Sequence, residues 1–284
     1  MGWREMVARW IVVLGIGLWL ANVTAAQIVA TNTPVADAFV RSLAPTNNYG
    51  AAGALSVSGS IATNTNGQQE GLLDSFLQFN VSGAVSNFNG AYGAGEWTIS
   101  SVTLTLTATS PNNTIFNYGS GSFEVRWIGD NAWQEGTGTP NSPATNGITY
   151  AQEPSILNSN VDESLGTFTY GGATSGQVKL SLGMPAGFIS EISTGGLVSL
   201  YVTATPNSTV GFTFNSRHYT SSSAWPALDI TAIPEPGTVS LVGLSCLVLA
   251  VMGRSRRNNT ARREPHSPRG IRCIAGSIAD GTRS

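Results

Sequence analysis

Apolar and polar residues alternate along much of the middle of the chain, in short stretches separated by Gly, Asn, Ser and Thr. The clearest stretch is Ser101–Thr109, where Val102, Leu104, Leu106 and Ala108 alternate with threonines. A strict period of two with β-branched residues on the polar side predicts a strand with one buried face. Similar stretches bounded by turn residues predict strands at Val35–Arg41, Ala54–Ser58, Ser75–Val81, Phe123–Trp127, Leu165–Tyr170, Gln177–Leu182, Val198–Ala204, Val210–Asn215 and Ala227–Thr231.

These stretches predict an all-β fold. About ten short strands without βαβ spacing are typical of a two-sheet antiparallel β-sandwich, and we expect a jelly roll. Only Pro185–Ser193, with Phe188, Ile189 and Ile192 on one side, predicts a short helix. An adhesive solenoid rich in Ser, Thr and Asn is the alternative, but the chain contains no repeat of fixed period to support it.

Near its end the chain has three consecutive parts of different character. Pro234-Glu235-Pro236 is followed by the uncharged, mostly apolar run Thr238–Met252 and then by the basic residues Arg254, Arg256 and Arg257. A helix over this run would span roughly 22 Å, short of the ~30 Å hydrocarbon core, so flanking residues or a thinner bilayer must contribute. The arginines that follow at once, and the lack of an amphipathic face, favour a transmembrane helix over a buried core helix.

This order of parts resembles the PEP-CTERM sorting signal of exported bacterial proteins, over residues 233–257. The resemblance implies recognition by an exosortase, a membrane-embedded, cysteine transpeptidase-like enzyme that would cut near Pro-Glu-Pro and release or transfer the passenger. Such signals normally end soon after the arginines, whereas here residues 258–284 continue as a tail rich in Ser, Arg and Gly. Either this tail is a disordered cytoplasmic extension or the chain's stop is displaced.

The first 26 residues have the features of a secretory signal peptide. Arg4 and Arg9 precede the apolar run Trp10–Ala21, and the small residues that end at Ala26 suit a signal peptidase. We expect cleavage after Ala26, which leaves Gln27 first, or one residue earlier; an uncleaved anchor is the alternative. Both ends together predict export to the cell envelope, cell surface or extracellular matrix, with transient anchoring in the inner membrane through the C-terminal helix.

Residues 27–232 then form one passenger domain, which is long enough for a single sizeable core. The domain has 4 basic and 12 acidic residues, so its net charge is near −8, although the whole chain has only −2. This excess argues against nucleic acid and other anionic polymers as partners. Cys246 and Cys273 lie outside the domain and His218 is its one histidine, which excludes a cysteine nucleophile and a histidine-rich zinc site.

Six short blocks of the passenger follow one another in a recognisable order: Ala36–Arg41, Asn48–Gly50, Ser75–Phe79, Trp133–Thr137, Ser216–Arg217 and Pro226–Leu228. This order resembles DNRLRE-type domains, which are extracellular β-sandwiches similar to carbohydrate-binding modules. The resemblance covers most of residues 35–232 and implies a non-catalytic, carbohydrate-binding-like domain. Near the end, Arg217-His218-Tyr219 and a serine run stand where the family has a Ser-x-Glu element.

Three tryptophans are candidate ligand-binding residues, because an aromatic ring packs well against the C–H face of a sugar. Trp97 and Trp225 are the preferred candidates, each weighed against a place in the core. Trp133 follows a polar loop, and the resemblance makes it a structural marker. Trp127 alternates with core residues and is expected inside the sandwich.

Three acids are candidate ligands of a structural calcium ion, the one cofactor that we consider. Asp37, Asp130 and Glu135 offer carboxylate oxygens, which calcium prefers in extracellular modules. The chain has no contiguous Asp-x-Asp calcium loop. Solvated loop acids or turn caps are therefore the competing interpretation.

No arrangement in the sequence points to catalytic residues. Asp162 and Glu163 are adjacent, so on a strand they would face opposite ways and could not flank one glycosidic bond. His218 and Asp229 have no serine in a Gly-x-Ser-x-Gly elbow. We therefore expect no enzyme but an exported, envelope or matrix protein that binds a polysaccharide; a purely structural matrix protein without a soluble ligand and a cryptic polysaccharide hydrolase or lyase are the alternatives.

Overall fold

The alternating stretches of the sequence form antiparallel β-strands. The computed structural model of the protein describes residues 26–235, apart from residue 65 and residues 110–118 and 173–174. Within these residues there are eleven strands, and all of their pairings are antiparallel. They are β1 (Ile28–Asn32), β2 (Pro34–Arg41), β3 (Ala54–Ser58), β4 (Leu73–Asn80), β5 (Trp97–Ala108), β6 (Gly121–Ile128), β7 (Glu163–Tyr170), β8 (Gly176–Leu182), β9 (Leu197–Ala204), β10 (Gly211–Asn215) and β11 (Ala227–Pro234).

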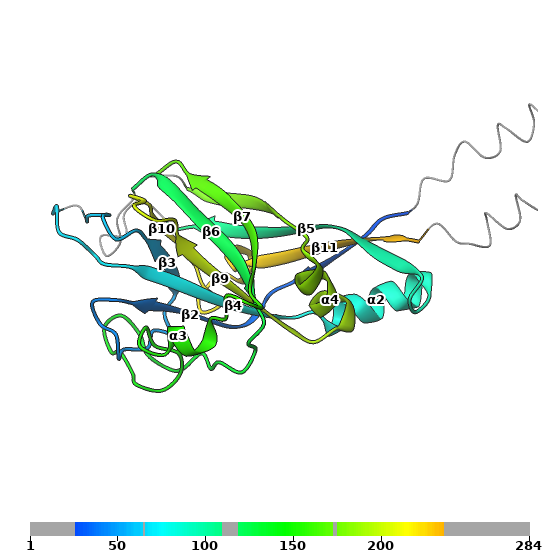
Figure 1. Ribbon diagram of the computed structural model, residues 1–284, viewed down its shortest axis with the longest axis horizontal. Helices are drawn as coiled ribbons and strands as arrows, with labels where there is room; N and C mark the ends of the chain where they lie inside the picture. The colour runs from blue at the N-terminus through cyan, green and yellow to red at the C-terminus, as the bar shows by residue number, and fades with distance from the viewer. Residues whose placement is uncertain (1–25, 65, 110–118, 173–174, 236–284) are drawn as a thin grey trace, which may run out of the picture. The chain divides into compact units, whose positions relative to one another are not determined.

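The strands form two layers that face each other across the core (Figure 1). One layer has the order β2-β4-β9-β6-β7, and the other has β8-β5-β11-β1. The pair β3-β10 connects them, because Phe214 of β10 lies opposite Ala108 of β5 and Ser58 of β3 lies opposite Leu73 of β4. The arrangement is consistent with the predicted β-sandwich; the jelly-roll connectivity stays a prediction.

The main core lies between the layers and is filled by the apolar positions of the alternating strands. The largest side chains of this core without solvent exposure include Phe79, Phe88, Phe123, Phe188, Phe212 and Phe214. Trp127 belongs to the same core, as its alternation with Phe123 and Val125 predicts. Burying aromatic and aliphatic side chains from both layers is the main source of stability in a domain without cysteines.

A second, smaller core lies on the other side of the β2-β4-β9-β6 layer. Strand β4 therefore has two buried faces: Leu77 and Phe79 join the main core, whereas Phe76 joins the smaller one. The chain between β6 and β7, residues 129–162, covers this outer face; we call it the covering segment. Its residues pack there beside Ala38, Val40, Phe76, Ile128 and Tyr201 and include Trp133, Ile148, Tyr150, Ile156 and Leu157. Figure 1 shows it in green, in the half of the sandwich away from the two chain ends.

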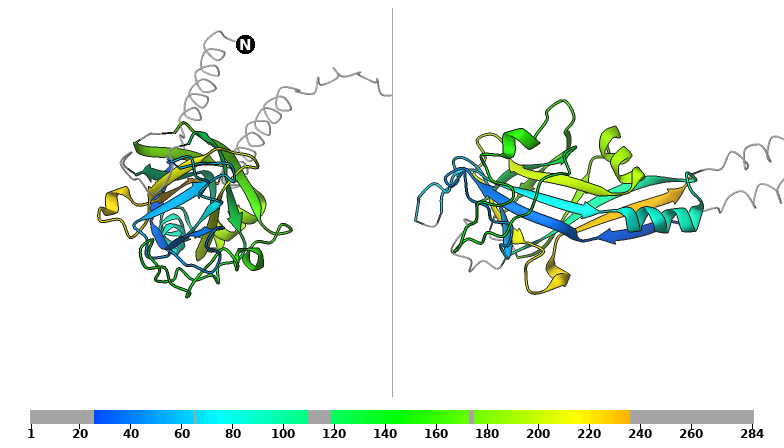
Figure 2. Two further views of the ribbon diagram at one scale, coloured as in Figure 1. Left: turned by 90° about the vertical axis from the view of Figure 1, so that its left-hand side faces the viewer. Right: turned by 90° about the horizontal axis from the view of Figure 1, so that it is seen from below.

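Short helices lie among the strands. The predicted helix is present as α4 (Ala186–Thr194), where Phe188 and Ile192 are buried and the Glu163 carboxylate accepts hydrogen bonds from the first backbone N–H groups. Helix α2 (Ser82–Tyr92) was not predicted, because its sequence is rich in Ser, Asn and Gly; it buries Ala84 and Phe88, four residues apart. The other helical segments within residues 26–235 as described are α3 (Glu153–Ile156) and the 3-10 turn η1 (Ser222–Ala224). Figure 2 shows α2 and α4 at the end of the sandwich where the chain enters and leaves.

The predictions for the two ends of the chain fall almost wholly outside the described residues. These residues contain no helix long and apolar enough to cross a membrane. The signal peptide up to residue 25, the transmembrane helix and the tail all lie beyond them and stay predictions. One strand, β1, was not predicted because only Gln27 separates it from the expected cleavage site and its alternation covers only five residues.

Candidate functional site

The covering segment is fixed to the outer face of the sheet by polar contacts between buried groups. The indole N–H of Trp133 donates to Ser199 Oγ at 2.9 Å, and Ser199 Oγ in turn donates to Asn131 Oδ1 at 2.7 Å. Gln78 Nε2 donates to the Asn131 carbonyl at 2.9 Å. Gln78 and Ser199 lie opposite each other on β4 and β9, so two adjacent strands hold the start of the segment in one place.

The surface of the covering segment has two neighbouring hollows. The first has a volume of about 260 Å³ and the second of about 300 Å³. Ser155 and Ile156 line both, so the two hollows adjoin along α3. We call the combined depression the α3 groove. The first hollow is lined by Ala132, Trp133, Gln134, Gly147, Ile148, Gln152, Ser155 and Ile156, and the second by Gly129, Asp130, Ser155, Ile156, Asn158, Val161 and Asp162.

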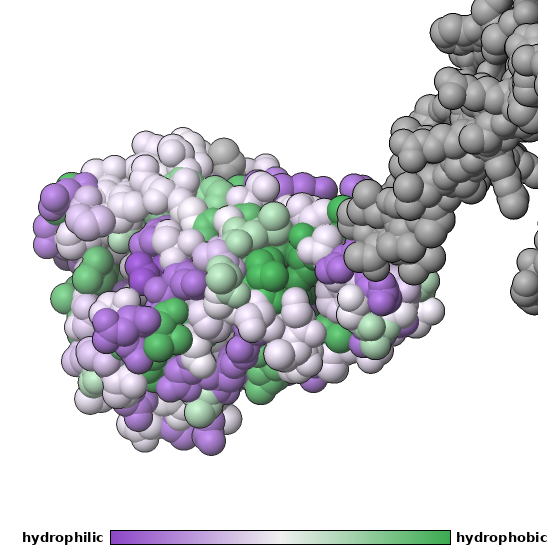
Figure 3. Space-filling view, turned by 45° about the vertical axis from the view of Figure 1, so that its right-hand side comes forward, coloured by the Kyte–Doolittle hydropathy of each residue, from purple (hydrophilic) through white to green (hydrophobic). Residues whose placement is uncertain are grey.

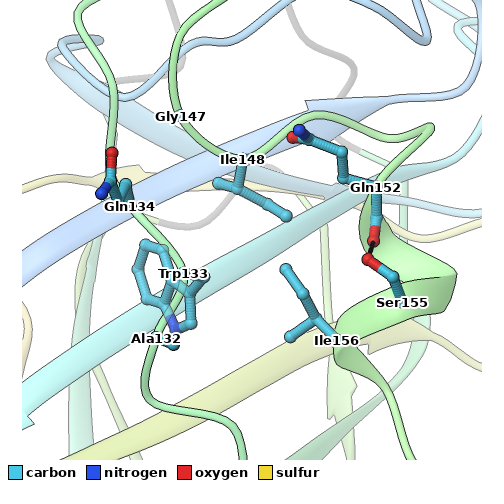
Figure 4. A pocket seen from close by; sticks show the side chains of 8 residues that line it. All are labelled: Ala132, Trp133, Gln134, Gly147, Ile148, Gln152, Ser155 and Ile156. Carbon is cyan, nitrogen blue, oxygen red and sulfur yellow. Dashed lines mark hydrogen bonds between the residues drawn. The ribbon is translucent and has the colours of Figure 1, made fainter.

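The first hollow combines an apolar base with polar side chains at its sides. Figure 4 shows the Trp133 ring, Ile148 and Ile156 around the hollow, with the amides of Gln134 and Gln152 on two sides of it. Gln134 and Gln152 are both exposed, whereas Trp133 is only 7% exposed. Apolar contact surface flanked by a few hydrogen-bonding groups is typical of sites for polar small molecules and sugars.

The two acids that line the second hollow accept hydrogen bonds from backbone N–H groups of the covering segment. Asp162 accepts hydrogen bonds from the Gly129 N–H at 3.1 Å and from the Asn158 N–H at 2.6 Å. Asp130 accepts from the Ala132 N–H at 2.7 Å, which makes it a turn cap. Glu163 caps α4 instead, so the adjacent acids Asp162 and Glu163 serve separate structures and do not converge on one bond.

Asp37 and Glu135, two of the three predicted calcium ligands, lie close together, but the third does not join them. Their neighbours are Arg217 and His218, and one ligand atom each of Asp37, Glu135 and His218 lies within 4.8 Å of the others. The backbone N–H of Arg217 donates to Asp37 Oδ2 at 2.6 Å, and Arg217 Nη1 donates to Glu135 Oε2 at 2.8 Å and to Glu135 Oε1 at 3.1 Å. Asp130 is absent from this cluster, which is drawn from the described residues only.

The positive charge in this cluster comes from the Arg217 guanidinium, which contacts Glu135. Burial, and then the nearby charge of Glu135, raise the pKa of Asp37 to about 8, although the hydrogen bond and charge of Arg217 oppose them. A protonated Asp37 beside the Glu135–Arg217 pair leaves the group neutral near pH 7. Calcium takes six to eight oxygen ligands, whereas here an arginine binds both oxygens of Glu135. The residues therefore do not fit a calcium ion.

Four of the six blocks that carry the family resemblance meet at this place. Asp37 lies on β2, Glu135 follows Trp133 in the covering segment, and Arg217 follows β10. Asn48 joins them, because its amide donates to the Glu135 carbonyl at 2.7 Å and accepts from the Gly138 N–H at 3.1 Å. The blocks thus form a structural junction that positions the covering segment.

The preferred tryptophans lie elsewhere on the domain. Trp97 begins β5, is half-buried against Phe88, and donates its indole N–H to Asn89 Oδ1 at 2.7 Å. Trp225 follows η1, and its indole N–H donates to the carbonyl of Tyr219. Tyr219 is 40% exposed. On the face shown in Figure 3, hydrophobic residues form small patches between hydrophilic ones.

The described parts of the processing motifs pack against the domain. Pro234 is the last residue of β11 and lies opposite Trp97, and the Glu235 N–H donates to the Glu96 carbonyl at 2.9 Å. The Ala26 carbonyl accepts from the Tyr92 hydroxyl at 2.6 Å, and the exposed Gln27 precedes β1. Pro236, Arg254, Arg256 and Arg257 lie outside the described residues.

The sequence did not indicate the polar side chains of the α3 groove. Gln134, Gln152 and Ser155 are common loop residues without a motif, and only the folding of the covering segment brings them together. Arg217 and His218 were known as a departure from the family pattern, but their contacts with Glu135 join residues more than 80 positions apart. No local signal could have found these contacts.

Comparison with known proteins supports a carbohydrate-binding-like domain. None of the curated proteins matches the chain. A family model does match, over a range that contains the covering segment, the α3 groove, Trp97 and Trp133, and leaves out Trp225 and Arg217. A match of this kind points to a non-catalytic binding domain. Residues 28–165 of this chain match the model of carbohydrate-binding module family 96.

Proposed function

We propose that the chain is a non-catalytic, exported protein of the cell envelope or extracellular matrix whose β-sandwich binds a polysaccharide in the α3 groove. The observation that carries the proposal is the groove itself, which lies within the range that matches a carbohydrate-binding family. Its exposed amides suit the hydroxyl groups of a sugar, and the partly exposed Ile156 offers a small apolar contact beside them. The ligand we expect is a neutral polysaccharide, because the domain carries a net charge near −8.

The groove is open rather than enclosed by a deep wall, and two hollows adjoin along it. An open site of this length suits an internal stretch of a chain more than a single sugar held on all sides. The groove offers few side chains to each sugar unit, so we expect each unit to contribute little to the binding free energy. Binding to a long or insoluble polysaccharide would then depend on repeated weak contacts.

The route to the cell surface is proposed from the sequence. A signal peptidase would remove residues 1–26, and an exosortase would act near Pro234-Glu235-Pro236 after transient anchoring by the following helix. Changing these three residues to alanine should block maturation in a host that carries the sorting enzyme and leave the domain folded. Unchanged processing there would contradict the sorting proposal without touching the binding proposal.

The binding experiment compares variants of the purified chain on insoluble polysaccharides and on a glycan array. Removal of a side-chain amide at Gln134→Ala or Gln152→Ala should weaken binding about 2- to 10-fold each, the effect of one lost hydrogen bond. Gln177→Ala is the matched control, because Gln177 is an exposed glutamine on β8 in the other layer.

Trp225→Ala tests the competing place for the ligand. Loss of binding in Trp225→Ala, with Gln134→Ala and Gln152→Ala unaffected, would move the site to the loop around η1. Absence of binding by the unaltered chain to every polysaccharide tested would favour the purely structural matrix protein, which is the second proposal that the fold allows.

A further inference from the structure

Two acids, one on the sheet and one in the covering segment, face each other where this segment rests on β4. Asp74 is on β4 and is 2% exposed, and Glu153 is the first residue of α3. One oxygen of each carboxyl group, Oδ1 of Asp74 and Oε2 of Glu153, is buried and makes no hydrogen bond with the described residues. Buried carboxyl oxygens without a donor are strongly unfavourable, so these two atoms require an explanation.

Hydroxyl groups surround the pair, and no cation reaches it. The Tyr201 hydroxyl lies 2.8 Å from Glu153 Oε1 and also contacts Asp74, but its single proton can be donated to only one of the two acids. The Thr203 hydroxyl donates to Asp74. Burial, and then the nearby charges of Glu153 and Asp74, raise the pKa of Tyr150. Among the ion pairs of the described residues, none involves Asp74 or Glu153.

The nearest arginine on the same face of the sheet is engaged elsewhere. Arg126 of β6 lies opposite Tyr201, but its guanidinium contacts Glu124 at 3.5 Å and the Asp162 carbonyl at 3.3 Å. The pair would therefore carry two negative charges in a buried place if both acids were ionised. Two like charges in such a place favour retention of a proton by one of them.

We propose that Asp74 and Glu153 share one proton, and that this proton holds α3 and the adjoining wall of the α3 groove against the sheet. The proton would give each unsatisfied oxygen a partner, as the donor on one acid and the acceptor on the other. When it is lost to solvent, two carboxylates repel each other at the place where the covering segment rests on β4. The sheet position is fixed by β2 and β9, so α3 is the part that moves.

The direction of the pH effect follows from the surroundings of the pair. Burial, and then the charge of Glu153, raise the pKa of Asp74 to about 7, and burial raises the pKa of Glu153. The shared proton is therefore present below neutral pH and is lost as the pH rises above about 7. Release of α3 displaces Ser155 and Ile156, which line both hollows. The shared proton between Asp74 and Glu153 is inferred from the fold alone. Only its effect on carbohydrate affinity rests on the proposed function.

The test is hydrogen–deuterium exchange of the purified chain between pH 6 and 8.5, with rates corrected for the intrinsic effect of pH. In the unaltered chain, backbone protection in peptides covering residues 150–157 should fall at least about fivefold more than in peptides from β9, since a pKa near 7 leaves few pairs protonated at pH 8.5. Glu153→Gln and Asp74→Asn keep the shape and replace the shared proton by an amide N–H. Both variants should keep their protection across this range.

Two controls test whether the shared proton, and not another group, causes the loss of protection in residues 150–157. Asp37→Asn removes another buried acid, and residues 150–157 should lose protection with rising pH in this variant as in the unaltered chain. Protection that does not change with pH in the unaltered chain, or that changes equally in Glu153→Gln, would overturn the proposal. So would protection at pH 8.5 that is restored by 1 mM calcium and removed by a chelator, because the pair would then hold a cation instead of a proton.

Discussion

The side-chain amide of Asn48 donates to the main-chain carbonyl of Ile148 at 2.8 Å, across 100 positions of the chain. The same nitrogen also donates to the Glu135 carbonyl, and the side-chain oxygen accepts from the Gly50 and Gly138 N–H groups. Asn48 is fully buried, so every polar atom of its side chain is satisfied without water. One asparagine thus joins the start of the covering segment to its middle.

Asn48→Asp should destabilise the domain strongly. The carboxylate has no N–H to donate, so the carbonyls of Glu135 and Ile148 lose their partner and a charge is buried beside them. The free energy of unfolding should fall by about 2–4 kcal/mol, measured by urea titration followed by fluorescence. Asn141→Asp, an exposed position in the same segment, should change stability little; equal losses in both variants would contradict the role of Asn48.

Gly138→Ala should be similarly damaging for a steric reason. A methyl group at Gly138 would overlap the backbone carbonyl of Asn48 and displace the covering segment. Gly83→Ala is the matched control, because a methyl group at this helical position meets nothing within 4 Å. Since alanine favours helix more than glycine, Gly83→Ala should be neutral or raise the free energy of unfolding by up to about 1 kcal/mol. The melting temperatures of both variants are compared. A lower value for Gly138→Ala alone indicates close packing at Gly138, whereas equal losses would indicate that the domain tolerates alanine at neither glycine.

Asp37→Asn should change how stability depends on pH. Burial raises the pKa of Asp37 to about 8 in the folded protein, well above its ordinary value near 3.8. The contribution of Asp37 to the free energy of unfolding therefore becomes less favourable as the pH rises from about 4 to about 8. The folded form binds the proton more tightly than the unfolded form in this range. The difference in unfolding free energy, variant minus unaltered chain, should therefore increase with pH by up to about 1.4 kcal/mol per unit and level off above pH 8.

Asp130→Asn is the control for this series. It also removes one acid, but it keeps an oxygen that accepts from the Ala132 N–H in an exposed turn. Its stability difference from the unaltered chain should not increase between pH 4 and 8. A constant difference for Asp37→Asn over the same range would mean that Asp37 is ionised in the folded protein and that the contacts with Arg217 outweigh the effect of burial.

Val102→Asp should prevent folding. Val102 has no solvent exposure and lies in β5 between Leu182 of β8 and Ile230 of β11, so its replacement places an unpaired charge inside the main core. Circular dichroism should show loss of the strand signal. Thr98→Asp, at an exposed position of the same strand, should leave the spectrum and the melting temperature close to those of the unaltered chain.

The strands were predictable because their information is local. Alternation in Ser101–Thr109 identifies which side chains of β5 face inward, and the described strand differs mainly by an extension to Trp97. The two-sided burial of β4 was not predictable in this way. Phe76 and Asp74 point to a second core that exists only because a segment 50 or more residues later folds over them.

The candidate site was far less accessible to sequence reasoning. The covering segment has few strands or helices, and its conformation depends on contacts with Asn48, Gln78 and Ser199, which are distant in the chain. Asp37 and Glu135 were candidate calcium ligands and lie close together, but the sequence could not show that Arg217 would pair with Glu135. Composition and resemblance indicate the kind of ligand; the groove that could receive it depends on tertiary contacts.

The pairing of the first strand with the last also determines how the domain can be combined with other chains. Ile28 of β1 lies opposite Ala232 of β11, so the entry and exit of the domain are about one strand spacing apart, roughly 5 Å. Both leave at the end of the sandwich opposite the covering segment (Figures 1 and 2). A single surface loop of another protein therefore has the right width to carry the whole domain as an insertion.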